Sequence, residues 1–340
     1  MTASRDADGP ATAAPGEQGP ALAGTADHSP ATAATAGHGP AEICAVVLAA
    51  GEGTRLRPLT ERLPKALCPV GNVPLLDRAL DRLAGLGLAG PARVAVNACY
   101  LGDQVVAHVG GRAHLSVEPG DPLGTAGGVA NLRDWIAGRG VLVGNADAYL
   151  ADPARPPGPD IAALLDGWDG DSVRLLGQPA ADPAAPGTFD GHVFTGFSLL
   201  PWRLVRELPV GFGDLVRAVW RPAEAAGALA VVPYPGTFYD TGTPADYLAA
   251  NLHAVGGGNL VDPTATVTGH CRSAVIGAGA VVHGDVERAV VWPGATVGPR
   301  ERLRDAVRAG VALTVPGTPP PAGRGTSSMG DDADERRNAP

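Results

Sequence analysis

Lysine is almost absent from this sequence. Lysine and arginine together number 26, but Lys65 is the single lysine, so arginine occupies every other basic position. The two side chains differ in shape, because a compact ammonium group can contact one phosphate oxygen where a wide guanidinium group does not fit. Since the chain keeps one lysine against such a strong compositional drift, we interpret Lys65 as a residue with a function.

The chain also lacks an excess of positive charge and any clustering of cysteine. Its formal net charge of −9 gives no electrostatic basis for sequence-independent binding to nucleic acid or to an anionic membrane. No apolar run has the length of a membrane span. The cysteines lie far apart, at Cys44, Cys68, Cys99 and Cys271. Without a C-x-x-C pattern they indicate neither a zinc site nor a disulfide framework, so we expect a cytoplasmic protein with small-molecule partners.

The ends of the chain lack the apolar residues that a folded segment needs. Residues 1–41 consist mainly of Ala, Gly, Pro and Thr, have no continuous apolar stretch of the kind found in a signal peptide, and cannot bury enough surface to become ordered. We predict disordered tails over residues 1–41 and 316–340. The remaining sequence predicts two folded domains, over residues 42–258 and 259–315.

Apolar runs typical of buried strands alternate with helical patterns in the first of these domains. The strands are predicted at residues 43–50, 93–97 and 141–145, and the helices at 73–86 and 125–137. Such alternation predicts a Rossmann-like α/β fold, in which a mixed, mostly parallel sheet carries helices on both faces. Ligands of such sheets bind at the carboxyl ends of the strands.

Valines recur at a spacing of six residues in the second domain. The pairs are Val261 and Val267, Val275 and Val281, and Val291 and Val297, with glycines between them. This hexapeptide pattern predicts a few coils of a left-handed β-helix, in which each coil buries an apolar residue against the next. An irregular Gly/Val-rich pair of strands is the alternative. A homo-oligomer formed through the β-helix is a candidate assembly.

The turn after the first predicted strand carries the most informative segment. Residues 46–60 read V-V-L-A-A-G-E-G-T-R-L-R-P-L-T, and residues 63–70 read L-P-K-A-L-C-P-V. Small residues let the backbone approach a nucleotide and direct amide groups at its phosphates, while Arg55 and Lys65 supply positive charge. The segment is neither a Walker A loop nor a dinucleotide-binding fingerprint, because Leu56 stands where the third glycine of that fingerprint would be.

These residues resemble the sugar-phosphate nucleotidylyltransferase family. Its pattern, L-A-A-G-x-G-T-R-L-x-P-L-T followed by P-K-x-L-x-P-V, is matched at residues 48–60 and 64–70. The resemblance implies transfer of a nucleoside monophosphate from a nucleoside triphosphate to a sugar 1-phosphate, with release of pyrophosphate. It implies that Arg55 grips the nucleotide phosphates and that Lys65 stabilises charge between the two substrates. The implied nucleotide-binding residues of this loop are Ala49, Ala50, Gly51, Gly53 and Thr54.

Two downstream segments match the family in the same order. Residues 122–128, P-L-G-T-A-G-G, resemble the family's loop against base and ribose, where missing side chains make room for the base; the residues implied are Gly124, Thr125, Ala126 and Gly127. Residues 194–200, F-T-G-F-S-L-L, resemble the strand that holds the sugar, with Gly196 making room for the ring. A half-buried strand explains most of this second segment equally well.

Two aspartates complete the resemblance. Asp147 follows the strand predicted at residues 141–145, and Asp240 precedes a helical pattern. The family uses these two carboxylates to bind magnesium. Mg²⁺ prefers a few hard oxygen ligands, completed by water and substrate phosphates, which two carboxylates in an open site can provide. We therefore expect Mg²⁺ as the cofactor.

The sequence departs from the family pattern in one short segment, residues 176–179. Many members carry E-K-P before the sugar strand, with a glutamate for sugar hydroxyls and a lysine for the sugar phosphate, whereas residues 176–179 read L-G-Q-P. Gln178 and Arg174 are our candidates to compensate. The loss of E-K-P favours an alternative function, a regulatory subunit that binds nucleotide sugars without efficient turnover. The retained Arg55 and Lys65 favour an enzyme.

The nucleobase and the sugar are left open by the sequence. The hexapeptide pattern resembles mannose-1-phosphate guanylyltransferases, and G-D-P-L-G-T-A-G-G at residues 120–128 looks more like muramate-1-phosphate uridylyltransferases. We favour the GDP-mannose type slightly over UDP- or dTDP-sugars, because the β-helix is a whole additional domain.

Overall fold

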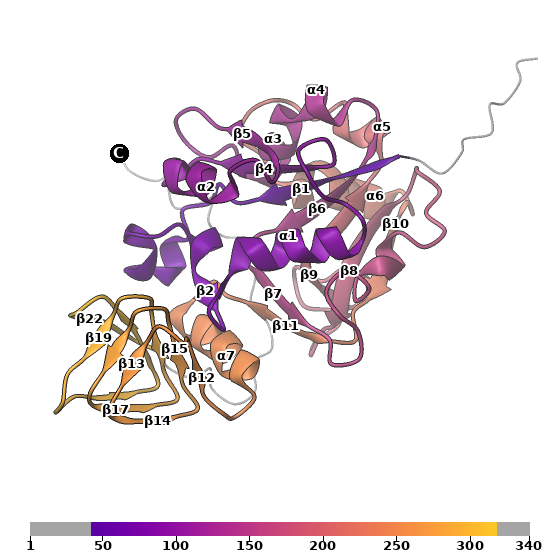
Figure 1. Ribbon diagram of the computed structural model, residues 1–340. Helices are drawn as coiled ribbons and strands as arrows, with labels where there is room; N and C mark the ends of the chain where they lie inside the picture. Colours follow the sequence, from indigo (N-terminus) through magenta and orange to yellow (C-terminus); the bar gives the residue numbers. More distant parts are fainter. Residues whose placement is uncertain (1–41, 318–340) are drawn as a thin grey trace, which may run out of the picture. The chain divides into compact units, whose positions relative to one another are not determined.

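A central sheet of seven strands organises the part of the chain that the computed structural model describes, residues 42–317. The strand order is β10-β8-β9-β6-β1-β4-β5 (Figure 1). Strand β9 is antiparallel to both of its neighbours, and all other neighbouring strands are parallel. The bounds are β1 Ile43–Leu48, β4 Val94–Ala98, β5 His114–Val117, β6 Gly140–Asn145, β8 Val173–Pro179, β9 His192–Leu200 and β10 Leu229–Pro233. The predicted mixed, mostly parallel α/β sheet is confirmed.

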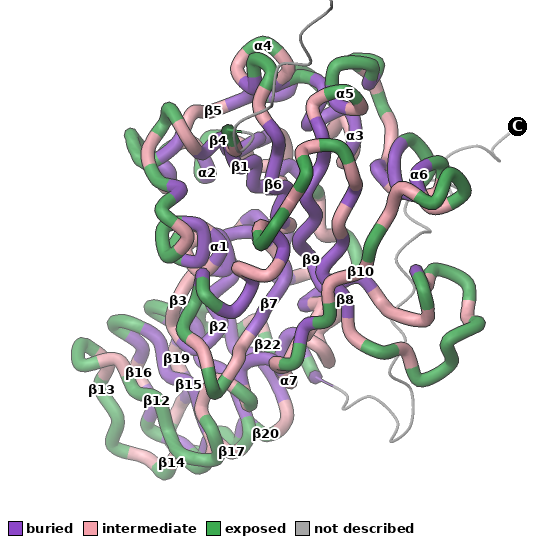
Figure 2. Tube along the Cα trace, turned by 90° about the vertical axis from the view of Figure 1, so that its right-hand side faces the viewer, coloured by how far each residue is buried: buried purple, intermediate pink, exposed green. Residues whose placement is uncertain are grey.

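Both faces of this sheet are covered, which explains why its strands are continuous apolar runs. In β1, Ala45 and Val47 belong to one hydrophobic core, and Cys44 and Val46 belong to another on the opposite face. Figure 2 shows the resulting burial along β1, β6 and β9. The first core includes residues of α1 (Leu75–Gly85) and α2 (Gly102–Val109). The second includes residues of α3 (Gly124–Asn131), α4 (Arg133–Ile136), α5 (Trp202–Val205) and α6 (Arg221–Ala225).

Short helical turns complete the helical content of the described residues. They are η1 Thr54–Leu56, η2 Leu59–Glu61, η3 Lys65–Leu67, η4 Ala162–Leu164 and the π-helical turn η5 Val216–Trp220. Between residues 42 and 317, no helix is both long enough and apolar enough to cross a membrane.

Two predicted helices have different limits in the structure. The helix predicted at residues 73–86 begins only at Leu75, because Val73–Pro74 forms strand β3, which pairs with β2 (Pro69–Val70). The helix predicted at 125–137 is interrupted at Leu132, whose amide bonds to the carbonyl of Val129 in a tighter turn. Three glycines within α3 lower its helix propensity, which is consistent with a short helix.

A small antiparallel sheet outside the central one brings two distant segments together. Strand β7 (Ala148–Ala151) pairs with β11 (Thr237–Asp240), so that Ala148 lies opposite Asp240. Helix α7 (Pro244–Val255) follows β11 after a short turn. Its start is fixed by the Thr243 hydroxyl, which accepts a hydrogen bond from the Asp246 amide at 3.2 Å.

Residues 260–316 form three short parallel sheets, which we call the strand stack. Leu260 lies opposite Val275, and Val275 opposite Val290, so the chain returns to the same sheet every 15 residues in these coils. The six-residue valine spacing carries the chain from one sheet to the next, as from β15 to β16. The first sheet contains β12 Leu260–Val261, β15 Val275–Ile276, β18 Val290–Val291, β21 Ala306–Ala309 and β22 Leu313–Pro316. The second contains β13 Thr266–Val267, β16 Val281–Val282 and β19 Thr296–Val297. The third contains β14 His270–Arg272, β17 Asp285–Glu287 and β20 Arg302–Arg304. The outermost strand, β22, is antiparallel to β21.

The strand stack shares a hydrophobic core with α7 and with apolar residues of the segment 56–75, which follows the glycine loop. The Trp292 indole N–H donates to the Tyr247 hydroxyl at 2.9 Å, and this hydroxyl donates to the Pro69 carbonyl. Tyr247 of α7 therefore links the stack to the P-K-A-L-C-P-V segment that carries Lys65. The tail predicted at residues 1–41 lies outside the described residues, as does the C-terminal tail except for Pro316 and Gly317.

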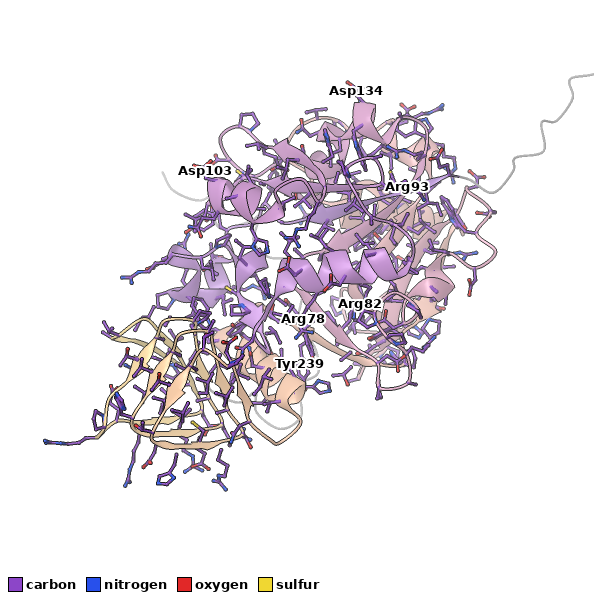
Figure 3. The ribbon with its side chains drawn as sticks, viewed as in Figure 1. Arg78, Arg82, Arg93, Asp103, Asp134 and Tyr239 are labelled. Atoms are coloured by element: carbon purple, nitrogen blue, oxygen red, sulfur yellow. The ribbon has the colours of Figure 1, made fainter. Side chains whose placement is uncertain are left out.

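A buried ion pair ties α1 to the segment after β7. Arg82 lies on α1 (Figure 3), and its guanidinium group contacts the Asp160 carboxylate at 3.0 Å. The side chains are 3% and 0% exposed. Arg82 also donates to the Leu150 carbonyl at 2.9 Å, and Asp160 accepts from the Gly158 amide at 2.9 Å. Such a pair is satisfied only while both partners are present.

Candidate functional site

Four charged side chains predicted from the sequence meet at one place. The Lys65 ammonium contacts the Asp147 carboxylate at 2.7 Å and the Asp240 carboxylate at 3.6 Å. The Arg55 guanidinium lies 3.7 Å from the other carboxylate oxygen of Asp240. Lys65 is only 9% exposed, whereas the side chains of Asp147 and Arg55 are 37% and 43% exposed. The cluster is therefore anchored in the protein at Lys65 and open to solvent at Asp147 and Arg55.

The sheet topology explains how these residues converge. Asp147 follows the carboxyl end of β6, and the pairing of β7 with β11 brings Asp240 beside it. The buried Thr241 hydroxyl donates to the Asp147 carbonyl at 2.8 Å and fixes the two segments together. At Gly242, a Cβ atom would lie 3.0 Å from the Arg55 guanidinium, so glycine at this position leaves room for that side chain.

The charges at Lys65 and Asp147 support each other. Burial alone would lower the pKa of Lys65, but the Asp147 and Asp240 carboxylates outweigh burial and raise it. Partial burial alone would raise the pKa of Asp147, but the Lys65 ammonium outweighs it and lowers it. A carboxyl group whose pKa is lowered by folding stabilises the fold at pH values above its unfolded-state pKa. A lysine whose pKa is raised by folding stabilises the fold at pH values below its unfolded-state pKa. Both side chains are therefore ionised at neutral pH, and the pair loses its stabilising effect only in strong acid or strong base.

The first loop of the site follows β1. Gly51 has no atom within 4 Å of the position where a Cβ would lie, so this part of the loop faces open space. Gly53 has a φ of +61°, which favours glycine, and its carbonyl accepts a hydrogen bond from the Thr60 hydroxyl at 2.8 Å. Ala49 and Ala50 are buried, and Thr54 begins η1. This open glycine loop runs directly into the turn that carries Arg55.

In the second loop, residues 122–128, Gly124 and Gly127 make room for another segment of the chain. A Cβ at Gly124 would overlap the Gly213 carbonyl, and one at Gly127 would overlap the Gly211 carbonyl. The Ala126 amide donates to the Gly213 carbonyl, and the Thr125 hydroxyl accepts from the Leu215 amide at 2.8 Å. The space left by these glycines is thus filled by residues 211–213. Contact of this loop with a nucleotide stays a prediction.

We expect Gly127→Ala to displace residues 211–213, because the added methyl group has no free volume beside the Gly211 carbonyl. The destabilisation should be about 1–3 kcal/mol, measured by urea denaturation. Gly138→Ala is not a matched control, because Gly138 has a φ of +90°. Gly111→Ala is one, since no atom lies within 4 Å of its added Cβ and its φ is not positive. Equal stability of the two alanine variants would contradict this packing.

Gly196, and Arg174 and Gln178 on the preceding strand β8, contact other parts of the chain. Gly196 has a φ of +94°, and its Cβ position is filled by Ala148, so the close approach of the chain requires glycine here. The Arg174 guanidinium donates to backbone carbonyls of Leu164, Asp166 and Gly167. Gln178 donates to the Gly236 carbonyl. Arg174 and Gln178 are therefore engaged with the chain itself, and neither contact replaces the missing E-K-P charges.

Two buried polar residues near both loops were not predicted. Asn97 lies at the carboxyl end of β4, and Glu118 follows β5; they are 2% and 4% exposed. The sequence did contain a signal, because each is a polar residue at or just after the carboxyl end of a strand, where ligand-binding residues of parallel sheets gather.

Comparison with known proteins shows a family and two relatives to which this chain is similar. Residues 44–156 match the model of a family described as nucleotidyl transferase. Over 298 residues the chain is 28% identical to a mannose-1-phosphate guanylyltransferase of Mycobacterium tuberculosis, covering 78% of this chain and 79% of that protein. Over 168 residues it is 39% identical to an N-acetylmuramate alpha-1-phosphate uridylyltransferase of Neisseria meningitidis, covering 48% of this chain and 67% of that protein.

A solved structure shares the fold. It is a Bacillus anthracis protein assigned as a glucose-1-phosphate thymidylyltransferase, crystallised with sucrose. The superposition has a TM-score of 0.52 at 20% identity, and covers 62% of this chain and 95% of the other. At this level of identity the likeness concerns the arrangement of the chain.

Proposed function

We propose the reaction of this site from one premise: the chain belongs to the family of sugar-1-phosphate nucleotidyltransferases. Its reaction transfers a nucleoside monophosphate from a nucleoside triphosphate to a sugar 1-phosphate and releases pyrophosphate. The observation that carries the assignment of the site is the meeting of Lys65 with Asp147 and Asp240 beside the open glycine loop. These charges lie where the phosphates of two anionic substrates must be brought together.

The chemistry needs no nucleophilic side chain. A sugar phosphate is mostly dianionic at neutral pH, since its second pKa is about 6, and one of its oxygens attacks the α-phosphorus of the nucleotide in line with the departing pyrophosphate. Bringing two anions together is the main obstacle, so positioning and charge neutralisation supply most of the catalysis. We assign Lys65 to the charge between the two substrates, and the exposed guanidinium of Arg55 to the triphosphate.

The carboxylates fit a magnesium ion. Asp147 and Asp240 offer hard oxygen ligands in a partly open site, and Mg²⁺ binds with few protein ligands when phosphates and water complete its shell. No group of three or more His, Cys, Asp or Glu side chains suited to a metal occurs within residues 42–317, which is compatible with this mode of binding. When bound, the ion would neutralise phosphate charge. Lys65 holds the two carboxylates in place.

The relatives support a proposal for the finer identity of the substrates. One relative that aligns over most of the chain is a guanylyltransferase for mannose 1-phosphate, and one that aligns over about half is a uridylyltransferase for N-acetylmuramate 1-phosphate. We favour a GDP-mannose type over a UDP- or dTDP-sugar type. The strand stack is proposed to be a short left-handed β-helix that supports a homo-oligomer, and the cytoplasm is the proposed location.

Release of pyrophosphate tests this function. The full chain is incubated with Mg²⁺ and each of GTP, UTP and dTTP, crossed with mannose, glucose, N-acetylglucosamine and N-acetylmuramate 1-phosphates. We expect turnover with one pair, dependent on both substrates, which separates transfer from hydrolysis of the triphosphate. Absence of turnover with every pair, together with binding of a nucleotide sugar in calorimetry, would instead support the regulatory subunit that the missing E-K-P favours.

A further inference from the structure

The two nucleotide loops are joined by a buried bridge of hydrogen bonds. The Ala49 amide, at the start of the first loop, donates to the side-chain oxygen of Asn97 at 2.7 Å. The side-chain amide of Asn97 donates to one oxygen of Glu118 at 2.7 Å. The other Glu118 oxygen accepts from the Leu123 amide at 2.8 Å, at the start of the second loop. Three bonds thus connect the two backbones through two side chains.

The residues around the bridge bury it and leave space for its two side chains. Both side chains are at least 96% buried, so water does not replace a lost partner. Gly128 makes room for them, because a Cβ there would lie 2.6 Å from the Asn97 nitrogen and 3.0 Å from a Glu118 oxygen. Leu123 precedes α3, and a carboxylate is favoured by the free amides and the dipole at a helix start.

We propose that Asn97 and Glu118 are positioning residues for the nucleoside triphosphate, and that their bridge sets the spacing between the glycine loop and the P-L-G-T-A-G-G loop. This inference rests on the proposed function. Asn97 and Glu118 bond to Ala49, to each other and to Leu123, whereas the Lys65 ammonium bonds to the Asp147 carboxylate. A disturbed bridge therefore weakens binding of the triphosphate, while the charge cluster that performs the transfer keeps its geometry.

The order of donors and acceptors allows a stringent test. In Glu118→Gln, the new amide has one oxygen for two donors, so one of its contacts sets nitrogen against nitrogen. In Asn97→Asp, two carboxylates face each other at the 2.7 Å contact. In the double variant, the carboxylate at position 97 accepts from Ala49 and from the new amide at position 118, whose oxygen accepts from Leu123. All three bonds are restored, and the charge has moved by one side chain.

The measurements are KM for the triphosphate, KM for the sugar phosphate, kcat, and binding of the Mg²⁺ complex of the triphosphate by calorimetry. GTP, UTP and dTTP serve as probes. We expect each single variant to raise KM and Kd for the triphosphate by about tenfold or more, as the loss of a buried hydrogen bond predicts. We expect kcat and KM for the sugar phosphate to stay within about threefold, and the double variant to return toward the wild type.

Several results would overturn the inference. Single variants that bind the triphosphate as the wild type does exclude a positioning role, and so does a loss of thermal stability without a change in KM. A double variant that binds the triphosphate about tenfold or more weakly than the wild type also excludes it, and this comparison holds even if a single variant fails to fold. If the wild type binds a triphosphate without turnover, only the proposed function fails. If it binds none of the three, both fail.

Discussion

Lys65→Met should lower kcat by about 10²- to 10³-fold, the usual effect of removing one preorganised group that stabilises charge in a transition state. Methionine keeps much of the unbranched stem of this nearly buried side chain but removes the ammonium group that contacts Asp147 and Asp240. Pyrophosphate release under saturating substrates measures the effect. Arg206→Met is the matched control, because it removes a cation from an exposed surface pair and should leave kcat unchanged.

Two further results sharpen this test. Lys65→Arg restores the positive charge but not the compact shape, and we expect kcat to stay low because the wider group does not fit between the two carboxylates. Without the ammonium, Asp147 and Asp240 repel each other, so added Mg²⁺ should raise the melting temperature of Lys65→Met more than that of the wild type. A value of kcat for Lys65→Met within tenfold of the wild type would contradict the role of Lys65.

Asp160→Ala should cost about 3–5 kcal/mol of folding free energy, because it leaves the Arg82 guanidinium buried without its carboxylate partner. The midpoint of urea denaturation measures the loss. Asp171→Ala removes a carboxylate from an exposed pair with Arg203 and should cost less than about 1 kcal/mol.

The double variant Arg82→Met with Asp160→Leu identifies the cause of this loss. It removes both buried charges, so it should be less destabilised than Asp160→Ala, although Leu150 and Gly158 lose their hydrogen-bond partners. If the double variant were the less stable of the two, packing around α1 rather than an unpaired charge would explain the effect.

Residues that lie within a local pattern could be predicted from the sequence. The apolar run of β1 followed by small residues predicted a strand and an open turn, and the structure places Gly51 facing open space. The resemblance to the family predicted Lys65 as a catalytic residue and Asp147 and Asp240 as metal ligands, and the structure brings the three side chains together. Their roles in catalysis stay predictions.

Features that depend on contacts between distant segments could not be predicted. The glycines at 124 and 127 were interpreted as space for a base, but residues 211–213 fill that space from nearly 90 positions further along the chain. The interruption at Leu132 was also not predicted, because the apolar periodicity continues through it. The bridge of Asn97 and Glu118 joins strands whose pairing the sequence did not specify.

The single, shielded lysine gives this protein an unusual behaviour toward amine-reactive reagents. Acylating probes such as N-hydroxysuccinimide esters attack a neutral amine, and the carboxylates beside Lys65 keep it protonated and largely out of solvent. No other lysine side chain is present to give a background signal. The rate of acylation at this position, followed by mass spectrometry of the peptide that contains Lys65 and so separated from acylation of the α-amino group, therefore reports how often the contact between Lys65 and Asp147 opens.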